Sequence, residues 1–311
     1  MSEALTTVRG RRITNNAGLP EPLVRAIAAD PYNPSSDFTV TGLIRPARIA
    51  ALERQHAGEI VEDASERIWA LMGQIGHLVL ERAASDEYSE QRFTVSLDVG
   101  ADRLYTVSGQ ADLWNGTDLT DYKFTSHWAA KDGLKPEWEQ QLNSLAYLLA
   151  ANGVIVTKAD IVAIFRDWSV GEARRNRDYP QHQVAVFPCP LWPRERQSLF
   201  LKERVRAHLN ARKVLPECTP LERWQRPGKW AVMHPGRKRA LRLCDTKQEA
   251  EKLATGNDYV EARPAIQTRC LDYCPVSQWC KQFEQIDPDG YNAAQPPPPD
   301  PAWLAEPTES V

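Results

Sequence analysis

The 311-residue sequence has no apolar run long enough to span a bilayer. Its first residues, MSEALTTVRGRR, contain no apolar segment of the kind that signal peptides need. We therefore expect a cytoplasmic protein that does not bind membranes. The sequence also lacks an excess of one charge, since 38 basic and 41 acidic residues give a formal net charge of -3. This balance gives no global signature of nucleic-acid binding, so such contacts would need local basic patches.

A phosphate-binding GxxxxGK[ST] loop is also missing. The nearest match, RPGKW, lacks the first glycine and the final Ser or Thr. A partner must therefore supply any step that needs ATP. What the sequence does have is a globular composition, with 42% hydrophobic and 25% charged residues. Its length allows one large domain or two smaller ones.

The order of the predicted elements indicates an α/β protein. Residues 63–84 have apolar residues at helical spacing, and Asp63 with Glu66 resembles a capping box. Strands follow in RFTVSLDV and in a hairpin, then a helix over 136–149 that Pro136 opens. Two further strands, ADIVAIFRDW and HQVAVF, precede a charged helix over 194–212. Helices alternating with strands in this way favour α/β layering.

Charged residues crowd the predicted hairpin SGQADLWNGTDLTDYKFT, residues 108–125. Its central Asn-Gly predicts a type I′ turn with a two-residue loop. Such a loop pairs Asp112 with Leu119, so that Asp112, Asp121 and Lys123 project from one side of the sheet. Two carboxylates there repel each other unless a cation lies between them, and oxygen ligands favour Mg²⁺ or Mn²⁺. The alternative is a solvent-facing hairpin with an incidental Asp–Lys pair.

His77 and Glu81 lie four residues apart in the helix before the hairpin, so they share a helical face. A single histidine on a helix is usually structural. The later motifs, taken together with His77, favour a functional role for this histidine.

The motifs occur in the order GxxxH (Gly73, His77), GxxD (Gly109, Asp112), DxK (Asp121, Lys123) and QLN from Gln141. This order resembles the PD-(D/E)XK nuclease superfamily, and within it the RecB-like branch with the CRISPR-associated and phage-encoded exonucleases. The resemblance covers residues 39–165 and 265–283. It implies a restriction-endonuclease-like core, which is a mixed central sheet flanked by helices.

The resemblance also implies roles for single residues. His77, Asp112 and Asp121 correspond to ligands of Mg²⁺ or Mn²⁺, with help from the backbone carbonyl of Tyr122. Lys123 corresponds to the catalytic lysine.

Further roles follow from the same resemblance. Glu81 would support the metal or its waters, and Gln141 would lie near the substrate phosphate or the attacking water. Many relatives carry a tyrosine at the position of Leu145, and here Tyr147 is the candidate to replace it.

Three cysteines lie close together in RCLDYCPVSQWC, with the spacing Cx3Cx5C. In a reducing compartment Cys270, Cys274 and Cys280 are poor disulfide candidates and good metal ligands. We expect Cys218 to be a fourth ligand, because it and Cys270 flank a compact insert whose ends should meet. The other two cysteines are expected to be buried in strand or strand-end positions: Cys189 and Cys244.

RecB-like nucleases with a 4Fe-4S cluster carry a similar trio, usually Cx2Cx5C, and one distant N-terminal cysteine. Here the trio is one residue longer, and TVTGLIRPARI in the N-terminal part has no cysteine. Four thiolates suit Fe-S and Zn²⁺ equally well by number. The resemblance favours a 4Fe-4S cluster with a structural role, and Zn²⁺ is the alternative.

The sequence divides into five expected segments. They are an N-terminal lead-in (1–38), the nuclease core (39–215), a ββαβ insert (216–264), a cysteine-rich segment completing the core (265–286) and a disordered Pro-rich tail (287–311).

The function expected from the resemblance is that of a metal-dependent DNase. An exonuclease acting on DNA ends or single strands in phage recombination or replication is favoured, with DNA as partner and a helicase or recombination protein as a further candidate. Two alternatives stay open: a non-catalytic DNA-binding adaptor, and a structure-specific endonuclease. The insert either binds DNA through Arg237, Lys238 and Arg239 or spaces the cysteines.

Overall fold

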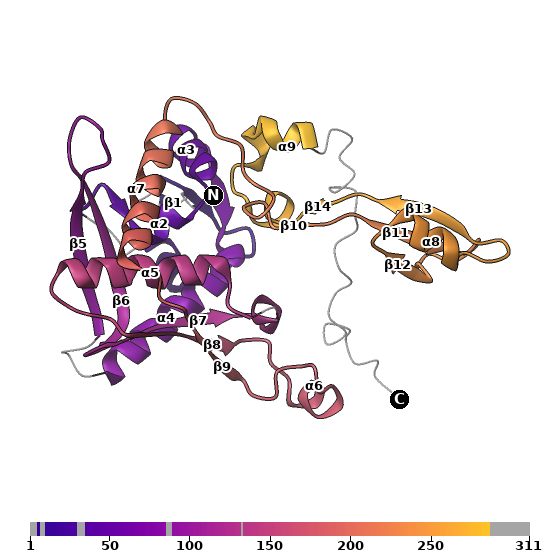
Figure 1. The fold of residues 1–311 in the computed structure, drawn as a ribbon, viewed down its shortest axis with the longest axis horizontal. Helices are drawn as coiled ribbons and strands as arrows, with labels where there is room; N and C mark the ends of the chain where they lie inside the picture. Colours follow the sequence, from indigo (N-terminus) through magenta and orange to yellow (C-terminus); the bar gives the residue numbers. More distant parts are fainter. Residues whose placement is uncertain (1–4, 7–9, 30–34, 85–88, 132, 287–311) are drawn as a thin grey trace. The chain divides into compact units, whose positions relative to one another are not determined.

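The computed structural model describes residues 5–6, 10–29, 35–84, 89–131 and 133–286. The chain forms two compact units, Met1–Pro216 and Glu217–Val311, and each is described by itself (Figure 1). The predicted Pro-rich tail, 287–311, lies outside the described residues. Within the described ranges, no helix is both long and apolar enough to cross a membrane.

The first unit is built on a mixed six-stranded sheet with the order β3-β6-β7-β8-β9, in which β5 also pairs with β6. The β3–β6 and β7–β8 pairs are parallel, and the other pairs are antiparallel. The strands are β3 (Phe38–Thr39), β5 (Ser89–Leu97), β6 (Tyr105–Asn115), β7 (Asp118–Thr125), β8 (Lys158–Phe165) and β9 (Val184–Pro188). The general class predicted from the sequence, an α/β protein with a mixed central sheet, is confirmed.

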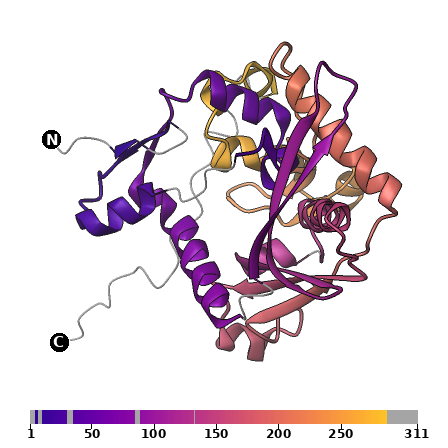
Figure 2. The same ribbon diagram turned by 90° about the vertical axis from the view of Figure 1, so that its left-hand side faces the viewer.

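Helices flank this sheet on both sides, with α5 and α7 on one side and α4 on the other (Figure 2). Helix α5 begins at Pro136 and its backbone turns away at Gly153, whose φ is 86°, as the proline and Asn-Gly signals predict. The helices of this unit after residue 38 are α2 (Val40–Ile44), α3 (Ala47–Gln55), α4 (Ile68–Ala83), α5 (Pro136–Ala151), α6 (Val170–Arg175) and α7 (Arg194–Asn210). The main core lies between α5 and the sheet, because α5 buries Leu142, Leu145, Leu148 and Leu149.

The N-terminal segment, expected as a lead-in, folds against the start of α4. Strands β1 (Leu5–Thr6), β2 (Arg12–Thr14) and β4 (Val61–Asp63) form a three-stranded sheet, and α1 (Glu21–Ala28) follows β2. A small core joins these elements through Ile13, Val24, Ile27 and Ala64. The predicted capping box is present: Asp63 caps the 3-10 turn Ala64–Arg67, and Glu66 reaches back to the Asp63 N–H.

Helix α4 has an unusual surface for a helix with so many apolar residues. None of its residues is buried. Five large apolar side chains are between 44% and 59% exposed: Trp69, Met72, Ile75, Leu78 and Val79. The periodicity therefore predicted the helix correctly but did not predict how little of it is covered.

The second unit contains the predicted ββαβ insert and the cysteine-rich segment together. The insert consists of β11 (Lys229–Met233), β12 (Arg242–Cys244), α8 (Lys247–Leu253) and β13 (Tyr259–Arg263), with the strand order β12-β11-β13. A two-stranded neck, β10 (Gln225–Arg226) paired with β14 (Ile266–Gln267), connects it to the cysteine-rich segment. That segment contains a π-helical turn (Arg269–Tyr273), a 3-10 turn (Ser277–Trp279) and α9 (Lys281–Ile286), and it belongs to this unit rather than to the first.

Candidate active site and cysteine cluster

The β6–β7 hairpin has a different register from the one predicted. Asn115 pairs with Asp118, so the loop is Gly116-Thr117 and not Asn115-Gly116, and the predicted pairing of Asp112 with Leu119 is wrong. The reason is conformational: a type I′ turn needs a positive φ at both loop residues, whereas here Gly116 alone has one, at 64°. The shift moves the pairing partner of each β6 residue by two positions. Because two is an even number, each side chain stays on the side of the sheet that the predicted register gave it.

The two strands separate where the acidic residues begin. The β6–β7 ladder ends at the pair Leu113–Thr120, and two residues further along β7 the backbone N–H of Tyr122 donates to Asp112 Oδ2 at 2.9 Å. The same carboxylate oxygen lies 3.4 Å from Nδ1 of His77 on α4. The structure thus brings Asp112, the Tyr122 backbone and His77 together at the fork of the hairpin.

Asp121 and Lys123 form the second part of the site. Asp121 is 1% exposed, and its Oδ2 lies 2.6 Å from Lys123 Nζ. Gln141 on α5 joins both residues: its Nε2 donates to Asp121 Oδ1 at 2.7 Å, and its Oε1 accepts from Lys123 Nζ at 2.8 Å. The glutamine that the motif order singled out is therefore in direct contact with the carboxylate and the ammonium of the DxK motif.

The two parts of the site influence each other electrostatically through His77. Burial lowers the pKa of this imidazole below its ordinary value, the Asp121 charge opposes that shift, and the Lys123 charge adds to it. At neutral pH the imidazole is consequently neutral, which is the form that can bind a metal ion.

The donor set suits a hard divalent cation. Two carboxylates, a neutral imidazole and a backbone carbonyl are ligands that Mg²⁺ or Mn²⁺ accepts. Asp121 Oδ2 is buried and has no hydrogen-bond partner among the described residues, because Lys123 Nζ is near it at an angle unsuited to a hydrogen bond. As they stand, however, the described residues include no group of three or more His, Cys, Asp or Glu side chains arranged for a metal ion. The ammonium of Lys123 balances the buried Asp121 charge in this arrangement.

Not every residue that the resemblance selected joins the site. Glu81 is exposed on α4. Leu145, at the position where relatives carry tyrosine, is buried in the main core. Tyr147 faces α7, where its hydroxyl accepts from Ser198 Oγ at 3.4 Å and Arg194 lies over its ring.

Gly76 and Gly73 of α4 differ in what surrounds them. A Cβ at Gly76 would overlap the ring of Phe124, which itself packs edge-on against His77, whereas a Cβ at Gly73 would meet nothing within 4 Å. Gly73→Ala should therefore stabilise the protein by up to about 1 kcal/mol through helix propensity. Gly76→Ala should cost about 1–3 kcal/mol in overpacking, partly offset by the same propensity.

Thermal denaturation of the two variants checks this prediction. We expect a higher midpoint than wild type for Gly73→Ala and a clearly lower one for Gly76→Ala. Equal midpoints for the two variants would show that α4 does not rest on Phe124 as described.

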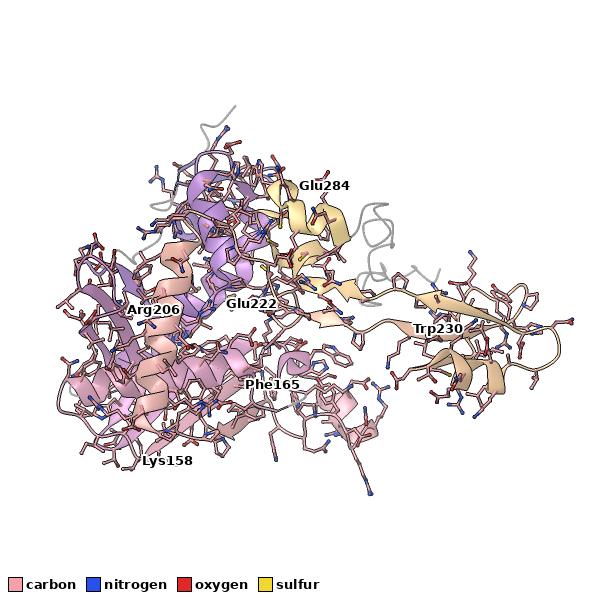
Figure 3. All side chains as sticks on the ribbon, turned by 45° about the horizontal axis from the view of Figure 1, so that its top comes forward. Lys158, Phe165, Arg206, Glu222, Trp230 and Glu284 are labelled. Atoms are coloured by element: carbon pink, nitrogen blue, oxygen red, sulfur yellow. The ribbon has the colours of Figure 1, made fainter. Side chains whose placement is uncertain are left out.

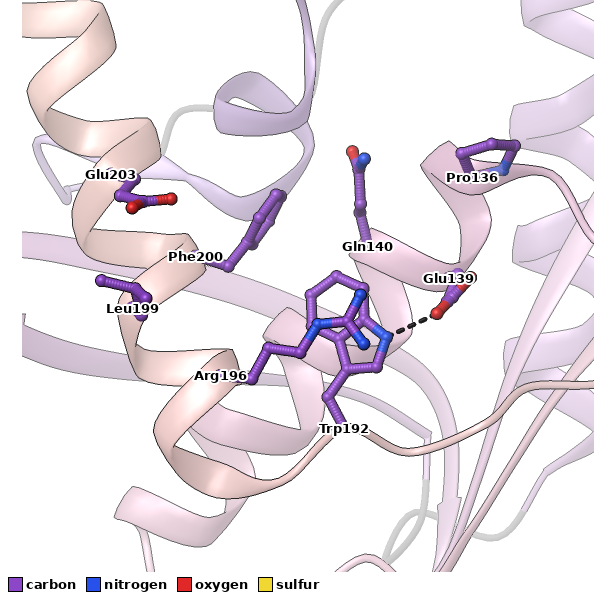
Figure 4. Close-up of a pocket in the computed structure, with 8 residues that line it drawn as sticks. All are labelled: Pro136, Glu139, Gln140, Trp192, Arg196, Leu199, Phe200 and Glu203. Atoms are coloured by element: carbon purple, nitrogen blue, oxygen red, sulfur yellow. Dashed lines mark hydrogen bonds between the residues drawn. The ribbon is translucent and has the colours of Figure 1, made fainter.

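A separate cavity of about 420 Å³ lies between α5 and α7. Figure 4 shows Trp192 in it, with the Arg196 guanidinium over the indole ring and a hydrogen bond from the indole N–H to Glu139. Gln140 also lines it, but none of the candidate active-site residues does. This cavity is thus distinct from the site around Asp121.

Three of the predicted cysteines lie near one another in the second unit: Cys270, Cys274 and Cys280. Together with Cys218 they belong to this unit, and none of the four forms a disulfide. Burial, with the charges that Cys274 and Cys280 would carry as thiolates, raises the pKa of the Cys270 thiol to about 11. A cation bound beside Cys270 would compensate the charge of its thiolate and so favour loss of the proton.

Cys218 is tied to the same segment. Its backbone N–H donates to Gln282 Oε1 at 2.8 Å, and its carbonyl accepts from Gln282 Nε2 at 2.9 Å. Arg223 donates to the same carbonyl and to Gln267 Oε1, and its charge acts on Cys270. The ends of the insert therefore meet, as the sequence argument requires. The remaining two cysteines are buried in strand or strand-end positions as predicted: Cys189 and Cys244.

Comparisons with known proteins do not identify the chain. No family model matches the sequence, and no curated protein matches it. Among solved structures it is similar to one titled "Crystal structure of SSO0001", with 19% sequence identity and a TM-score of 0.43 over 60% of this chain and 85% of that chain. A likeness of this size defines neither the family nor the activity.

Proposed function

We propose that the protein is a metal-dependent deoxyribonuclease with a PD-(D/E)XK-like core, which hydrolyses phosphodiester bonds at DNA ends or on single strands. The observation that carries the proposal is the contact of Asp121, Lys123 and Gln141, beside an Asp112–His77 pair, at a fork between two strands. These residues come from α4, β6, β7 and α5, so the fold rather than one local segment assembles them.

Each residue has a task in this reaction. A Mg²⁺ or Mn²⁺ ion held by Asp112, Asp121, His77 and the Tyr122 carbonyl would supply Lewis acidity and an activated water. Gln141 fixes the directions of the Asp121 carboxylate and the Lys123 ammonium through its two hydrogen bonds. The Tyr122 N–H fixes Asp112 in the same way.

Lys123 acts on the charge that develops during hydrolysis. The water gives a proton to solvent as its oxygen forms a bond to phosphorus, the bond from phosphorus to the leaving sugar oxygen breaks, and a proton from solvent completes the alcohol product. A positioned ammonium stabilises the negative charge on the phosphoryl oxygens in the transition state. Its 23% exposed side chain is able to turn from Asp121 towards a bound phosphate.

The cysteine cluster is part of the same proposal. A 4Fe-4S cluster, or Zn²⁺ in the alternative, would be held by Cys218, Cys270, Cys274 and Cys280. It would connect the segment before β10, which contains Cys218, to the segment after β14, which contains the other three cysteines. The contacts of Cys218 with Gln282 and of Arg223 with Gln267 make the same connection without a metal.

Incubation with linear and covalently closed circular DNA tests the activity. We expect Mg²⁺ or Mn²⁺ to support degradation of linear DNA, with no hydrolysis in EDTA and little of the circle. Cutting of the circle would instead indicate a structure-specific endonuclease. Intact DNA of every form with both metals would contradict the proposal and favour the non-catalytic adaptor.

A further inference from the structure

Two tryptophans of the first unit are unusually exposed and each is faced by a cation. Trp69 on α4 is 55% exposed, and Trp128, in the 3-10 turn His127–Ala130, is 66% exposed. The Arg166 guanidinium lies 4.2 Å from the Trp69 ring centroid, and Lys131 Nζ lies 5.3 Å from that of Trp128. Large aromatic rings are seldom left this open in a folded protein. We call these four residues the stacking surface.

The stacking surface lies at the end of the strands that carry the candidate site. Phe165 is the last residue of β8 and Lys158 the first, and Figure 3 labels both ends. Arg166 follows Phe165, and its backbone N–H donates to the carbonyl of Thr125, the last residue of β7. Ser126, where the turn begins, is three positions after Lys123, which is about 10 Å along a strand or about three stacked nucleotides.

The turn that carries Trp128 is held firmly in place. Asp167 accepts hydrogen bonds from the His127 backbone N–H at 2.8 Å and from the Ser126 hydroxyl. Burial raises the pKa of Asp167, but these bonds outweigh burial and the net pKa is lowered, so the carboxylate stays ionised. The His127 ring packs against Trp128 and Tyr179 in tilted arrangements, with centroids 4.8 and 4.7 Å away. An exposed ring on a fixed turn is pre-organised for binding.

The charge of the surrounding segment is complementary to a phosphate chain. Residues 166–178 contain four arginines and three acidic residues. Two of these acids are already engaged: Asp167 with the Ser126–His127 turn, and Glu172 with Arg175 at 2.8 Å. No carboxylate of the described residues forms an ion pair with the remaining three arginines, Arg166, Arg174 and Arg177.

We propose that the stacking surface holds unpaired bases of DNA while Arg166, Lys131 and the neighbouring arginines bind its phosphates. The inference rests on the proposed function and narrows its substrate to single-stranded DNA or single-stranded overhangs. Aromatic rings stack on any unpaired base, and bases inside a duplex already stack on one another. The candidate site then hydrolyses a DNA strand whose unpaired bases stack on Trp69 and Trp128.

Binding measured without hydrolysis tests this inference. The full-length protein is titrated in EDTA against a fluorescein-labelled oligo(dT) and against a blunt hairpin duplex, with anisotropy as the readout. Trp128→Ala and Trp69→Ala should each weaken oligo(dT) binding by about 5- to 100-fold and change duplex binding little. Trp128→Phe, which keeps a ring, should retain most of the affinity. Arg166→Ala should reduce the slope of log K against log salt by about 0.7.

Ile155→Ala provides the control, because Ile155 is 73% exposed in the segment before β8, at the opposite end of that strand. It should bind oligo(dT) as wild type does. Wild-type affinity in both tryptophan variants, equal losses for oligo(dT) and duplex, or no oligo(dT) binding by the wild type would each overturn the inference. A wild type that binds oligo(dT) through these tryptophans yet hydrolyses no DNA would overturn the proposed function alone.

Discussion

Asp121→Asn should lower metal-dependent hydrolysis of linear DNA by about 10³-fold or more, the range seen when a central catalytic group is removed. The amide keeps the shape of the carboxylate but loses the charge that would bind a divalent cation. It also removes the partner that balances Lys123 in the free protein, whose Nζ lies 2.6 Å from Oδ2. Lys123→Met should cost about 10²–10³-fold, since it leaves the carboxylates in place.

The chain offers a matched control on the adjacent strand. Asp160 of β8 is 7% exposed, pairs with Thr120 across the β7–β8 ladder, and lies 2.7 Å from Lys158 Nζ. It is therefore another buried aspartate with a lysine two residues away, and its partner Lys158 is not part of the candidate site. Asp160→Asn and Lys158→Met should leave the rate of hydrolysis within about twofold of wild type.

The rate of DNA hydrolysis is measured for each variant and divided by the concentration of folded protein. The midpoint of thermal unfolding of each variant then shows whether a lower rate reflects lost chemistry or lost structure. If Asp121→Asn and Asp160→Asn reduce hydrolysis equally, then Asp121 acts by stabilising the sheet. Full activity in Asp121→Asn would contradict the proposal that Asp121 belongs to the active site.

Replacement of cysteines in the second unit should have an all-or-none effect on metal content. Cys274→Ser or Cys280→Ser should abolish bound metal in protein purified without oxygen, because a thiolate is lost from a four-ligand site. Iron and sulfide in a brown wild-type protein would indicate Fe-S, whereas zinc in a colourless one would indicate the alternative. Structural metal sites contribute about 10–16 kcal/mol of apparent binding free energy, so residues 217–286 should become open to proteolysis.

Two comparisons make this result specific. Cys244→Ala and Cys189→Ala should keep the wild-type metal content, since both side chains are buried away from the trio. Cys218→Ser should lose the metal as Cys274→Ser does. Wild-type metal content in Cys218→Ser would mean that the fourth ligand is a different residue, and metal-free wild-type protein would contradict the cluster itself.

Local signals in the sequence predicted local structure well. The Asp63 capping box, the Pro136 helix start and the ββαβ order of the insert all depend on residues close together in the chain, and the structure confirms them. The hairpin register was wrong by two positions because Asn115-Gly116 and Gly116-Thr117 both leave Gly116 in the loop. Sequence alone could not decide which residue would pair with Asp118.

Contacts between distant residues were out of reach for a different reason. The motif order selected Gln141, but only the packing of α5 on β7 shows that it binds both Asp121 and Lys123. Nothing in the sequence links Trp69 with Arg166, since 97 residues separate them and neither belongs to a motif. Trp128 lies shortly after the DxK strand in the sequence, but only the structure shows that its ring is exposed.

The neck of the second unit explains how an insert of this size fits into the chain at all. Strands β10 and β14 carry the chain into and out of the insert side by side. At Gly228 the two backbones are so close that a Cβ would lie 2.8 Å from the Arg263 carbonyl oxygen. The residues from Lys229 to Arg263 therefore start and finish at one point, like the loop of a hairpin. Shortening such a module therefore leaves the path of the segments that carry Cys218 and Cys270 unchanged.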